Sequence, residues 1–275
     1  MSVALASAAG VTDEDADLLI AALAERGVSS ELALWDEARD WDAHELVVVR
    51  STWDYTARRE EFLAWARSVA RLANPYPIIE YSSDKRYLFD LARRGFPVIP
   101  TSLVVPGQLP VFPEGDVVVK PSVGAGSMDA ERFFAHEHER ARALVARLHA
   151  AGRDVLVQPY VHSVDEAGER ALIFLGGAFS HAMTKAAMLN VAGEVRDRLY
   201  RAERMSRAEA EPEALELASA VLSEFADLTY ARVDLLHTPE GWAILELEMV
   251  EPSLFLSFEP AAPGRLAEAI IAAMP

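Results

Sequence analysis

Apolar and polar positions alternate in blocks along the first eighty residues. Short apolar runs at 3–7, 30–34 and 46–50 predict strands, and amphipathic stretches at 13–26 and 58–72 predict helices between them. Strands that alternate with helices of this length are typical of βαβ units around a parallel sheet. Such sheets bind small ligands in the loops beyond the carboxyl ends of their strands.

The loop after the apolar run Val47–Val49 is therefore a candidate substrate-binding loop. It brings together an arginine, two hydroxyls, a carboxylate and an aromatic ring, which is typical of a polar small-molecule pocket. The candidate substrate-binding residues are Arg50, Ser51, Thr52, Trp53 and Asp54. The alternative is a helix N-cap region with Trp53 packed beneath it.

The sequence Asn74-Pro75-Tyr76-Pro77 interrupts this pattern and predicts a boundary, so we expect units at residues 1–80, 81–156 and 157–275. After this interruption the sequence predicts a strand at 78–79, a helix at 84–94, strands at 98–105 and 117–120, a helix at 137–150 and a strand at 155–158. The last unit reads as an antiparallel sheet with two helices, at 170–175, 178–185, 213–225, 230–236, 242–249 and 264–273. The segment 190–211, rich in Arg and Glu, is expected to be a charged mobile loop. The fold class is α/β, with a parallel N-terminal domain.

Composition limits the function classes. The chain has 275 residues, of which 51% are hydrophobic and 25% charged, as in a globular protein with a real core. Its net charge of -17 disfavours a nucleic-acid partner. It has no cysteine, which excludes disulfides, thiolate metal sites and cysteine nucleophiles. No apolar stretch approaches a membrane span, so we expect a cytoplasmic protein without a membrane partner.

Lysine is rare in this chain. Of 26 basic residues only Lys85, Lys120 and Lys185 are lysines, and the rest are arginines. Lys and Arg are not interchangeable where a compact ammonium must reach a phosphate oxygen. The three lysines are therefore candidates for phosphate contacts, although chance retention on the surface is the alternative.

The C-terminal hairpin carries the strongest local signal. Glu246 and Glu248 share one face of a strand because side chains alternate with period two. The preceding strand offers Asp234, which lies opposite Glu246 if the loop around 238–241 has an odd number of residues. Like charges opposed in a sheet repel one another, and a hard divalent cation would relieve that repulsion. The hairpin therefore predicts a metal site for Mg²⁺, with Mn²⁺ as the alternative ion; the other interpretation is a solvated acidic face.

The order of these features resembles the ATP-grasp superfamily over roughly residues 81–275. Several segments are similar to the D-cycloserine synthetase (O-ureido-serine cyclo-ligase) group, namely 49–55, 83–88, 119–127, 179–182 and 251–256. The resemblance implies a two-lobed ATP-grasp fold after the N-terminal domain. It also implies a place in antibiotic biosynthesis.

The resemblance implies a role for each matching residue. Lys85 and Lys120 would reach the α- and β-phosphates of ATP, and the segment Ser122–Ser127 would be a lid over the β- and γ-phosphates. Further ATP contacts would come from Gly124, Gly126, Ser127, Gln158, Val161 and Asp165, with Gln158 and Val161 at adenine and Asp165 at the ribose. Groups that neutralise the transferred phosphate would be Arg170, Lys185 and either Arg196 or Arg198, of which we favour Arg198.

Asp234, Glu246 and Glu248 would hold Mg²⁺, although many ATP-grasp enzymes have Asn at the position of Glu248. Arg232, beside the metal strand, is a candidate for stabilising the oxyanion or holding the substrate carboxylate, and a salt bridge near Asp234 is the alternative. These residues predict an ADP-forming carboxylate–amine ligase for a small amino-acid-like substrate. An O-ureido-serine-like cyclisation is the nearest named reaction.

Two other readings stay open on the sequence. One is a phosphotransferase that uses the same grasp and makes no C–N bond, and the other is a non-catalytic nucleotide-binding regulator. A homodimer is compatible with all three.

Overall fold

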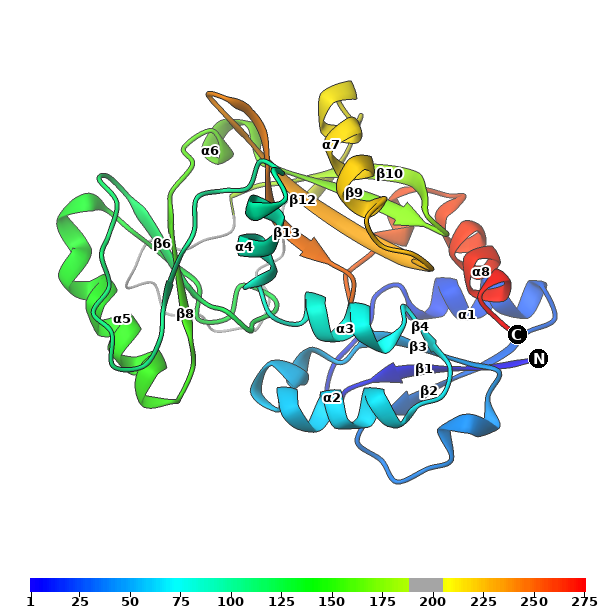
Figure 1. Cartoon of the computed structure of the whole chain (residues 1–275). Coiled ribbons are helices and arrows are strands. Elements are labelled where there is room, and N and C mark those ends of the chain that lie inside the picture. Colours follow the sequence, from blue (N-terminus) through cyan, green and yellow to red (C-terminus); the bar gives the residue numbers. More distant parts are fainter. Residues whose placement is uncertain (188–204) are drawn as a thin grey trace.

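In the computed structural model the described residues are 1–187 and 205–275, and their strands form three sheets (Figure 1). The first is parallel, in the order β2-β1-β3-β4. Its strands are β1 Ser2–Ser7, β2 Ser29–Leu34, β3 Leu46–Ser51 and β4 Leu72–Ala73. Its helices are α1 Ala16–Glu25, α2 Arg59–Ser68 and α3 Tyr76–Ser82, with 3-10 turns at Trp41–Ala43 and Trp53–Ala57. The predicted parallel N-terminal sheet is confirmed.

The second sheet is antiparallel, in the order β5-β8-β6-β7. Its strands are β5 Ser102–Val104, β6 Val117–Pro121, β7 Glu131–Phe133 and β8 Val155–Pro159. Helix α5, His138–Ala150, follows a 3-10 turn at Ala135–Glu137 and covers one face of this sheet. Leu144 and Leu148 of α5 pack there against Val117 and Val157. Helix α4, Tyr87–Arg93, precedes the sheet.

The third sheet is also antiparallel, in the order β11-β10-β9-β12-β13. Its strands are β9 Glu169–Leu175, β10 Ala178–Lys185, β11 Met205–Ala208, β12 Tyr230–Thr238 and β13 Gly241–Glu248. The remaining helices are α6 Val164–Ala167, α7 Pro212–Leu222 and α8 Ala262–Ala272, with a 3-10 turn at Leu256–Phe258. The predicted antiparallel C-terminal sheet is confirmed, with β11 as an additional strand.

Apolar residues alternate along the strands of the third sheet and build two different cores. On one face Leu172, Val233 and Leu247 pack with α4 and α7. On the other face Ile173 and Tyr230 pack with α1, α8 and the first sheet. The N-terminal and C-terminal ends of the chain consequently lie close together (Figure 1).

The structure corrects three element predictions. Residues 78–79 belong to helix α3, because the prolines that we read as breakers occupy its N-cap and first turn, where proline is tolerated. Helix α2 ends at Ser68, and Leu72–Ala73 form an edge strand. In the expected loop 190–211, Met205–Ala208 is strand β11, and residues 190–204 lie outside the described residues.

The unit boundaries near 80 and 156 stay predictions, and β8 runs across the second of them. No helix within 1–187 or 205–275 has the length and apolar character needed to cross a bilayer.

Candidate active site

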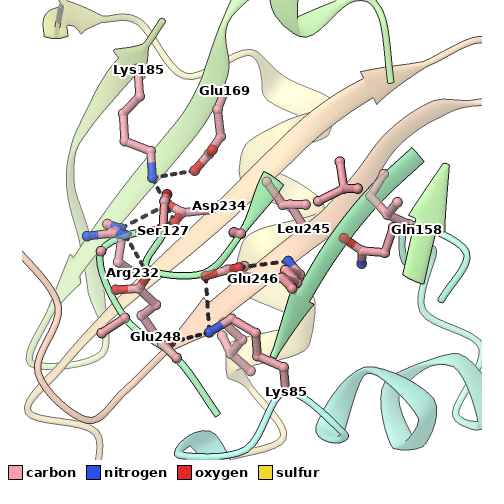
Figure 2. Close-up of a pocket in the computed structure, with 18 of the residues that line it drawn as sticks. Lys85, Ser127, Gln158, Glu169, Lys185, Arg232, Asp234, Leu245, Glu246 and Glu248 are labelled. Carbon is pink, nitrogen blue, oxygen red and sulfur yellow. Dashed lines mark hydrogen bonds and ion pairs between the residues drawn. The ribbon is translucent and has the colours of Figure 1, made fainter. Parts of the chain in front are cut away.

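A deep pocket lies between the inner faces of the second and third sheets (Figure 2). The second sheet contributes Lys120 and Gln158, which share a face because α5 covers the alternate positions. The third sheet contributes a set of charged side chains that all point into the pocket, namely Glu169, Lys185, Arg232, Asp234, Glu246 and Glu248. All three lysines of the chain line this pocket.

Strand register explains why so many charges share one face. Asp234 pairs with Glu246 and Arg232 with Glu248 across β12 and β13, and paired residues point the same way. The predicted opposition of Asp234 and Glu246 is confirmed, although it arises from a β-bulge between Asp234 and Leu235 and not from an odd-numbered loop, since only two residues join the strands. On β9 and β10, Glu169 pairs with Lys185 and lies on that same face. Because side chains alternate along each strand, these charged residues gather at one end of a face of the third sheet that is otherwise apolar.

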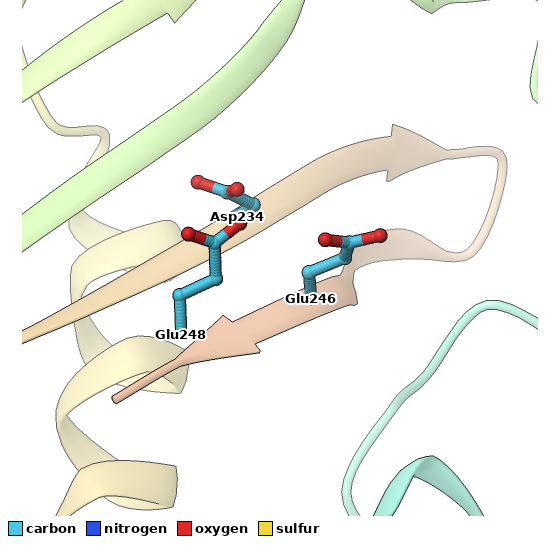
Figure 3. Close-up of side chains that lie close together, drawn as sticks. All are labelled: Asp234, Glu246 and Glu248. Atoms are coloured by element: carbon cyan, nitrogen blue, oxygen red, sulfur yellow. The ribbon is translucent and has the colours of Figure 1, made fainter. Parts of the chain in front are cut away.

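Three carboxylates form a compact cluster on the β12–β13 hairpin (Figure 3). Asp234, Glu246 and Glu248 each offer an oxygen, and these oxygens all lie within 4.8 Å of one another. Asp234 is only 1% exposed. A set of carboxylate oxygens at this spacing fits the hard-cation preference of Mg²⁺. The donor set therefore suits the predicted metal.

Cationic side chains balance the cluster. Arg232 donates from Nε to Asp234 Oδ1 and from Nη2 to Oδ2, both at 2.9 Å, and from Nη2 to Glu248 Oε1 at 2.7 Å. Lys185 Nζ lies 3.0 Å from Asp234 Oδ2 and also pairs with Glu169. Lys120 Nζ lies 2.8 Å from Glu246 Oε1. The positive and negative side chains pair with one another across the pocket. An incoming anion can therefore take over the cationic side chains, and a metal ion can take over the carboxylates.

Burial and charge act in opposite directions on these groups. Burial alone would raise the pKa of Asp234, but Arg232 and Lys185 lower it below its usual range. Burial would likewise raise the pKa of Glu246, yet Lys120 and Lys85 hold it low. Glu248, by contrast, has a raised pKa because burial and the neighbouring carboxylates outweigh Arg232. Asp234 and Glu246 are therefore charged at neutral pH and available as ligands.

The loop after β6 closes over one side of the pocket. Gly124, Gly126 and Ser127 line it, and Lys85 Nζ donates to the Gly124 carbonyl while lying 3.7 Å from Glu246 Oε2. The backbone N–H of Lys85 also donates to the Ser122 carbonyl at 2.8 Å. The structure thus brings Lys85 and this loop together, as the resemblance requires.

Two of the three residues predicted to contact adenine and ribose line the pocket, and one does not. Gln158 and Val161 line the pocket, and Gln158 Nε2 donates to Thr101 Oγ1 at 2.9 Å. Asp165 does not line it; its carboxylate accepts from Tyr160 Oη at 2.6 Å and pairs with Arg132. The Asp165 side chain remains 42% exposed beside the pocket.

Arg170, which we expected to neutralise the transferred phosphate, does not line the pocket. It neighbours Glu169 on β9 and therefore points to the opposite face of the sheet. There its Nε donates to Glu211 Oε2 at 3.0 Å, and it contacts Thr184. Glu169 occupies the pocket position instead. Arg196 and Arg198 lie outside the described residues.

The predicted substrate loop is also only partly in the pocket. Trp53 lines it, together with Tyr55, whereas Arg50, Ser51, Thr52 and Asp54 do not. Arg50 is 2% exposed and pairs with Asp13 at 3.2 Å. Ser51 and Thr52 are buried, and Asp54 accepts from Trp35 Nε1 at 2.8 Å.

Arg50 acts instead on the segment 251–256, which also borders the pocket. Its guanidinium lies within 3.5 Å of the Pro252 carbonyl and 3.8 Å of Asp15. Asp15 in turn accepts from the backbone N–H groups of Leu254 at 3.2 Å and Leu256 at 2.9 Å. A buried ionic network thus ties this pocket segment to the N-terminal sheet.

Sequence reasoning assigned no role to several pocket residues, among them Tyr55, Glu169, Glu251 and Phe255. The sequence separation of Glu169 and Lys185 does not predict that they pair; this follows only from the register of β9 and β10. Glu251 was included only in the segment 251–256, yet burial, with the charge of Glu248 adding to it, raises its pKa to about 8.

Comparison with known proteins agrees with this site. Residues 3–74 match the family described as D-cycloserine synthetase DcsG, N-terminal domain, and residues 111–255 match the RimK-like ATP-grasp domain. The cycloserine biosynthesis protein DcsG of Streptomyces lavendulae is 38% identical over 278 residues, covering 94% of this chain and 93% of that protein. The chain belongs to the DcsG family of ATP-grasp proteins. It is accordingly an ATP-dependent ligase that joins a carboxylate to an amine and forms ADP.

Solved structures place the fold in the same family. The crystal structure of D-cycloserine synthetase DcsG superposes with a TM-score of 0.90 at 36% identity, covering 99% of both chains. The D-alanine–D-alanine ligase from Bacillus anthracis complexed with ATP superposes with a TM-score of 0.70 at 14% identity, covering 99% of this chain and 97% of that one. The second similarity concerns the fold alone, and it agrees with the predicted ATP-grasp architecture.

Proposed function

We propose that this ligase activates the carboxylate of an O-ureido-serine-like amino acid and closes it onto a nitrogen of the same molecule. The observation that carries the proposal is the convergence of all three lysines and three clustered carboxylates in one pocket bordered by Trp53 and Tyr55. The similarity to DcsG over nearly the whole chain supports the cyclo-ligase form of the reaction. A small-molecule substrate suits a pocket with this polar and aromatic lining, and the same similarity supports a place in antibiotic biosynthesis.

The residues divide the work as follows. Lys85 and Lys120 bind the phosphate chain of ATP, with the loop of Gly124 and Gly126 over it. Ser127 lies in the same loop. Gln158 and Val161, which line the pocket, are our candidates for binding adenine, and Asp165, which lies beside it, is our candidate for the ribose. When bound at the carboxylates of the hairpin, Mg²⁺ supplies charge neutralisation to the transferred phosphoryl group.

The chemistry then needs positioning more than a protein nucleophile. A carboxylate oxygen of the substrate attacks the γ-phosphorus of ATP, the bond to ADP breaks, and an acyl phosphate forms. The substrate nitrogen attacks the acyl carbon, and inorganic phosphate leaves. Lys185 and Arg232, both buried in the pocket, are placed to stabilise the negative charge that develops on the transferred phosphate and on the acyl oxygen. Arg198 is a further candidate for this role.

Product analysis tests the proposal. With ATP, Mg²⁺ and O-ureido-D-serine we expect ADP and phosphate in equal amounts together with a cyclic product. Added hydroxylamine should trap the acyl phosphate as a hydroxamate. A stable phosphorylated product without hydroxamate would instead support the phosphotransferase reading, and no nucleotide turnover with any carboxylate would support the regulator. The cytoplasmic location and the homodimer stay predictions.

A further inference from the structure

One carboxylate in the pocket differs from all the others. Five acidic side chains line it, and four have cationic partners there: Glu169, Asp234, Glu246 and Glu248. Glu251 is the fifth, and it is 8% exposed. Among residues 1–187 and 205–275, no side chain forms a salt bridge or a hydrogen bond with its carboxylate.

The cations near Glu251 are already engaged. Lys85 and Arg232 both act on it electrostatically. Lys85, however, donates to the Gly124 carbonyl and lies beside Glu246, and Arg232 is hydrogen-bonded to Asp234 and Glu248. The Glu251 carboxylate accepts a hydrogen bond from its own backbone N–H but has no cationic partner of its own. A buried carboxylate without a cationic partner is costly in free energy, so a ligand that brings a positive charge would be favoured there.

Glu251 also stands apart from the metal cluster. Only Asp234, Glu246 and Glu248 form a metal-competent group in the described part of the chain. Glu251 follows the end of β13 and borders the N-terminal domain, where its backbone carbonyl accepts from Trp53 Nε1 at 3.3 Å. It is therefore placed on the substrate side of the pocket rather than on the nucleotide side.

The surroundings suit an organic ammonium rather than a metal ion. Trp53 and Tyr55 line the pocket beside the segment of Glu251, and aromatic faces attract cations. The backbone that follows Glu251 is held in place, because Arg50 donates to the Pro252 carbonyl and Asp15 accepts from the N–H groups of Leu254 and Leu256. A carboxylate on an anchored backbone segment can discriminate between ligands that differ by one charged group.

We infer that Glu251 is the subsite for the substrate's primary ammonium group, which makes this ligase specific for amino acids over simple carboxylic acids. The inference rests on the proposed function, since it places the acyl-donating substrate in the same pocket. The raised pKa of Glu251 in the ligand-free protein agrees with it, because an arriving ammonium would stabilise the charged carboxylate.

The experiment compares matched ligands that differ only in the ammonium group. Binding of O-ureido-D-serine and of 3-(ureidooxy)propanoate is measured by titration calorimetry in the presence of ADP and Mg²⁺. The wild-type protein should bind the amino acid roughly 10- to 100-fold more tightly, as expected for a charged hydrogen bond in a buried site. In Glu251→Gln the two ligands should bind within about threefold of each other.

The ratio of the two affinities is unaffected by the fraction of folded protein, so it remains informative if the variant is less stable. Glu251→Asp keeps the charge and should retain most of the preference. Glu240→Gln removes one negative charge from the exposed β12–β13 turn and should leave the ratio as in the wild type. Preference retained in Glu251→Gln, or absent in the wild type, overturns the inference.

Failure of the proposed function would look different. If the enzyme does not cyclise O-ureido-D-serine, the same comparison is made with D-alanine and propanoate, which also differ only by the ammonium group. Loss of the preference for D-alanine in Glu251→Gln would then support the subsite although the cyclo-ligase proposal has failed. Equal binding of D-alanine and propanoate to the wild type would refute the subsite itself.

Discussion

Replacing Arg232 by methionine is expected to destabilise the ligand-free protein strongly. Arg232 is 6% exposed and holds Asp234 through two hydrogen bonds and Glu248 through a third. Methionine preserves most of the apolar stem but removes the charge. Asp234 would keep Lys185, whereas Glu248 would lose the only hydrogen-bonding partner it has among the described residues.

The expected magnitude follows from the geometry. Two unit charges about 4 Å apart attract by about 4 kcal/mol at the effective dielectric typical of proteins. Removing one partner of a buried pair typically costs about 3–5 kcal/mol, because the other charge stays buried. Each kcal/mol of lost stability lowers the midpoint of thermal unfolding by about 2–4 °C in proteins somewhat shorter than this one. The midpoint of the variant should therefore fall by roughly 6–20 °C.

Thermal unfolding in EDTA is the assay, with Arg93→Met as the matched control. Arg93 is 77% exposed and pairs with Asp90 at 2.9 Å, so its loss should have little effect. The double variant Arg232→Met/Glu248→Gln should recover part of the loss, since it also neutralises the abandoned carboxylate. If Arg232→Met shifts the midpoint no more than Arg93→Met does, the interpretation of this buried network is wrong.

Four further variants test other parts of the site. Glu246→Gln should lower Mg²⁺-dependent turnover at least tenfold with an unchanged circular dichroism spectrum, because a metal ligand is lost; full activity would discard the metal assignment. Lys120→Ala should weaken ATP binding about tenfold in calorimetry, since a cation beside the phosphates is removed, and an unchanged affinity would count against it. Asp15→Asn should raise the KM for the carboxylate substrate about tenfold while the KM for ATP stays constant, because the segment 251–256 loses an anchor; equal changes in both would contradict this. For pH, folding raises the pKa of Glu251 from 4.5 to about 8, so its contribution to stability is complete below pH 4.5 and is lost as the pH rises through 8. The unfolding midpoint of the wild type should therefore fall relative to Glu251→Gln between pH 5 and 8, and a constant difference would refute the shift.

Features that depend on residues close together in the sequence could be predicted from it. The apolar runs predicted the parallel sheet of the N-terminal domain and the antiparallel sheet that follows, and both are confirmed. Period-two alternation was enough to place Glu246 and Glu248 on one face, but Asp234 lies opposite Glu246 only because of a β-bulge between Asp234 and Leu235, which the sequence did not reveal. The rarity of lysine pointed to three residues that do line one pocket, although 65 residues separate Lys120 from Lys185 in the sequence.

Features that depend on register and packing between distant segments were not readable. Arg170 and Glu169 are adjacent in sequence, and only the pairing of Glu169 with Lys185 decides which of them enters the pocket. Arg50 has the chemistry of a substrate ligand, but the approach of Asp13 and the segment near Pro252 turns it into a buried anchor.

What the sequence determined by itself is thus the alternation within each strand and the short hairpin, because these are set by local geometry. The tertiary structure decided which strand faces meet, which charges find partners and which carboxylate, Glu251, is left for a ligand. Burial and charge pairing are properties of the assembled sheets, and no single stretch of the chain specifies them.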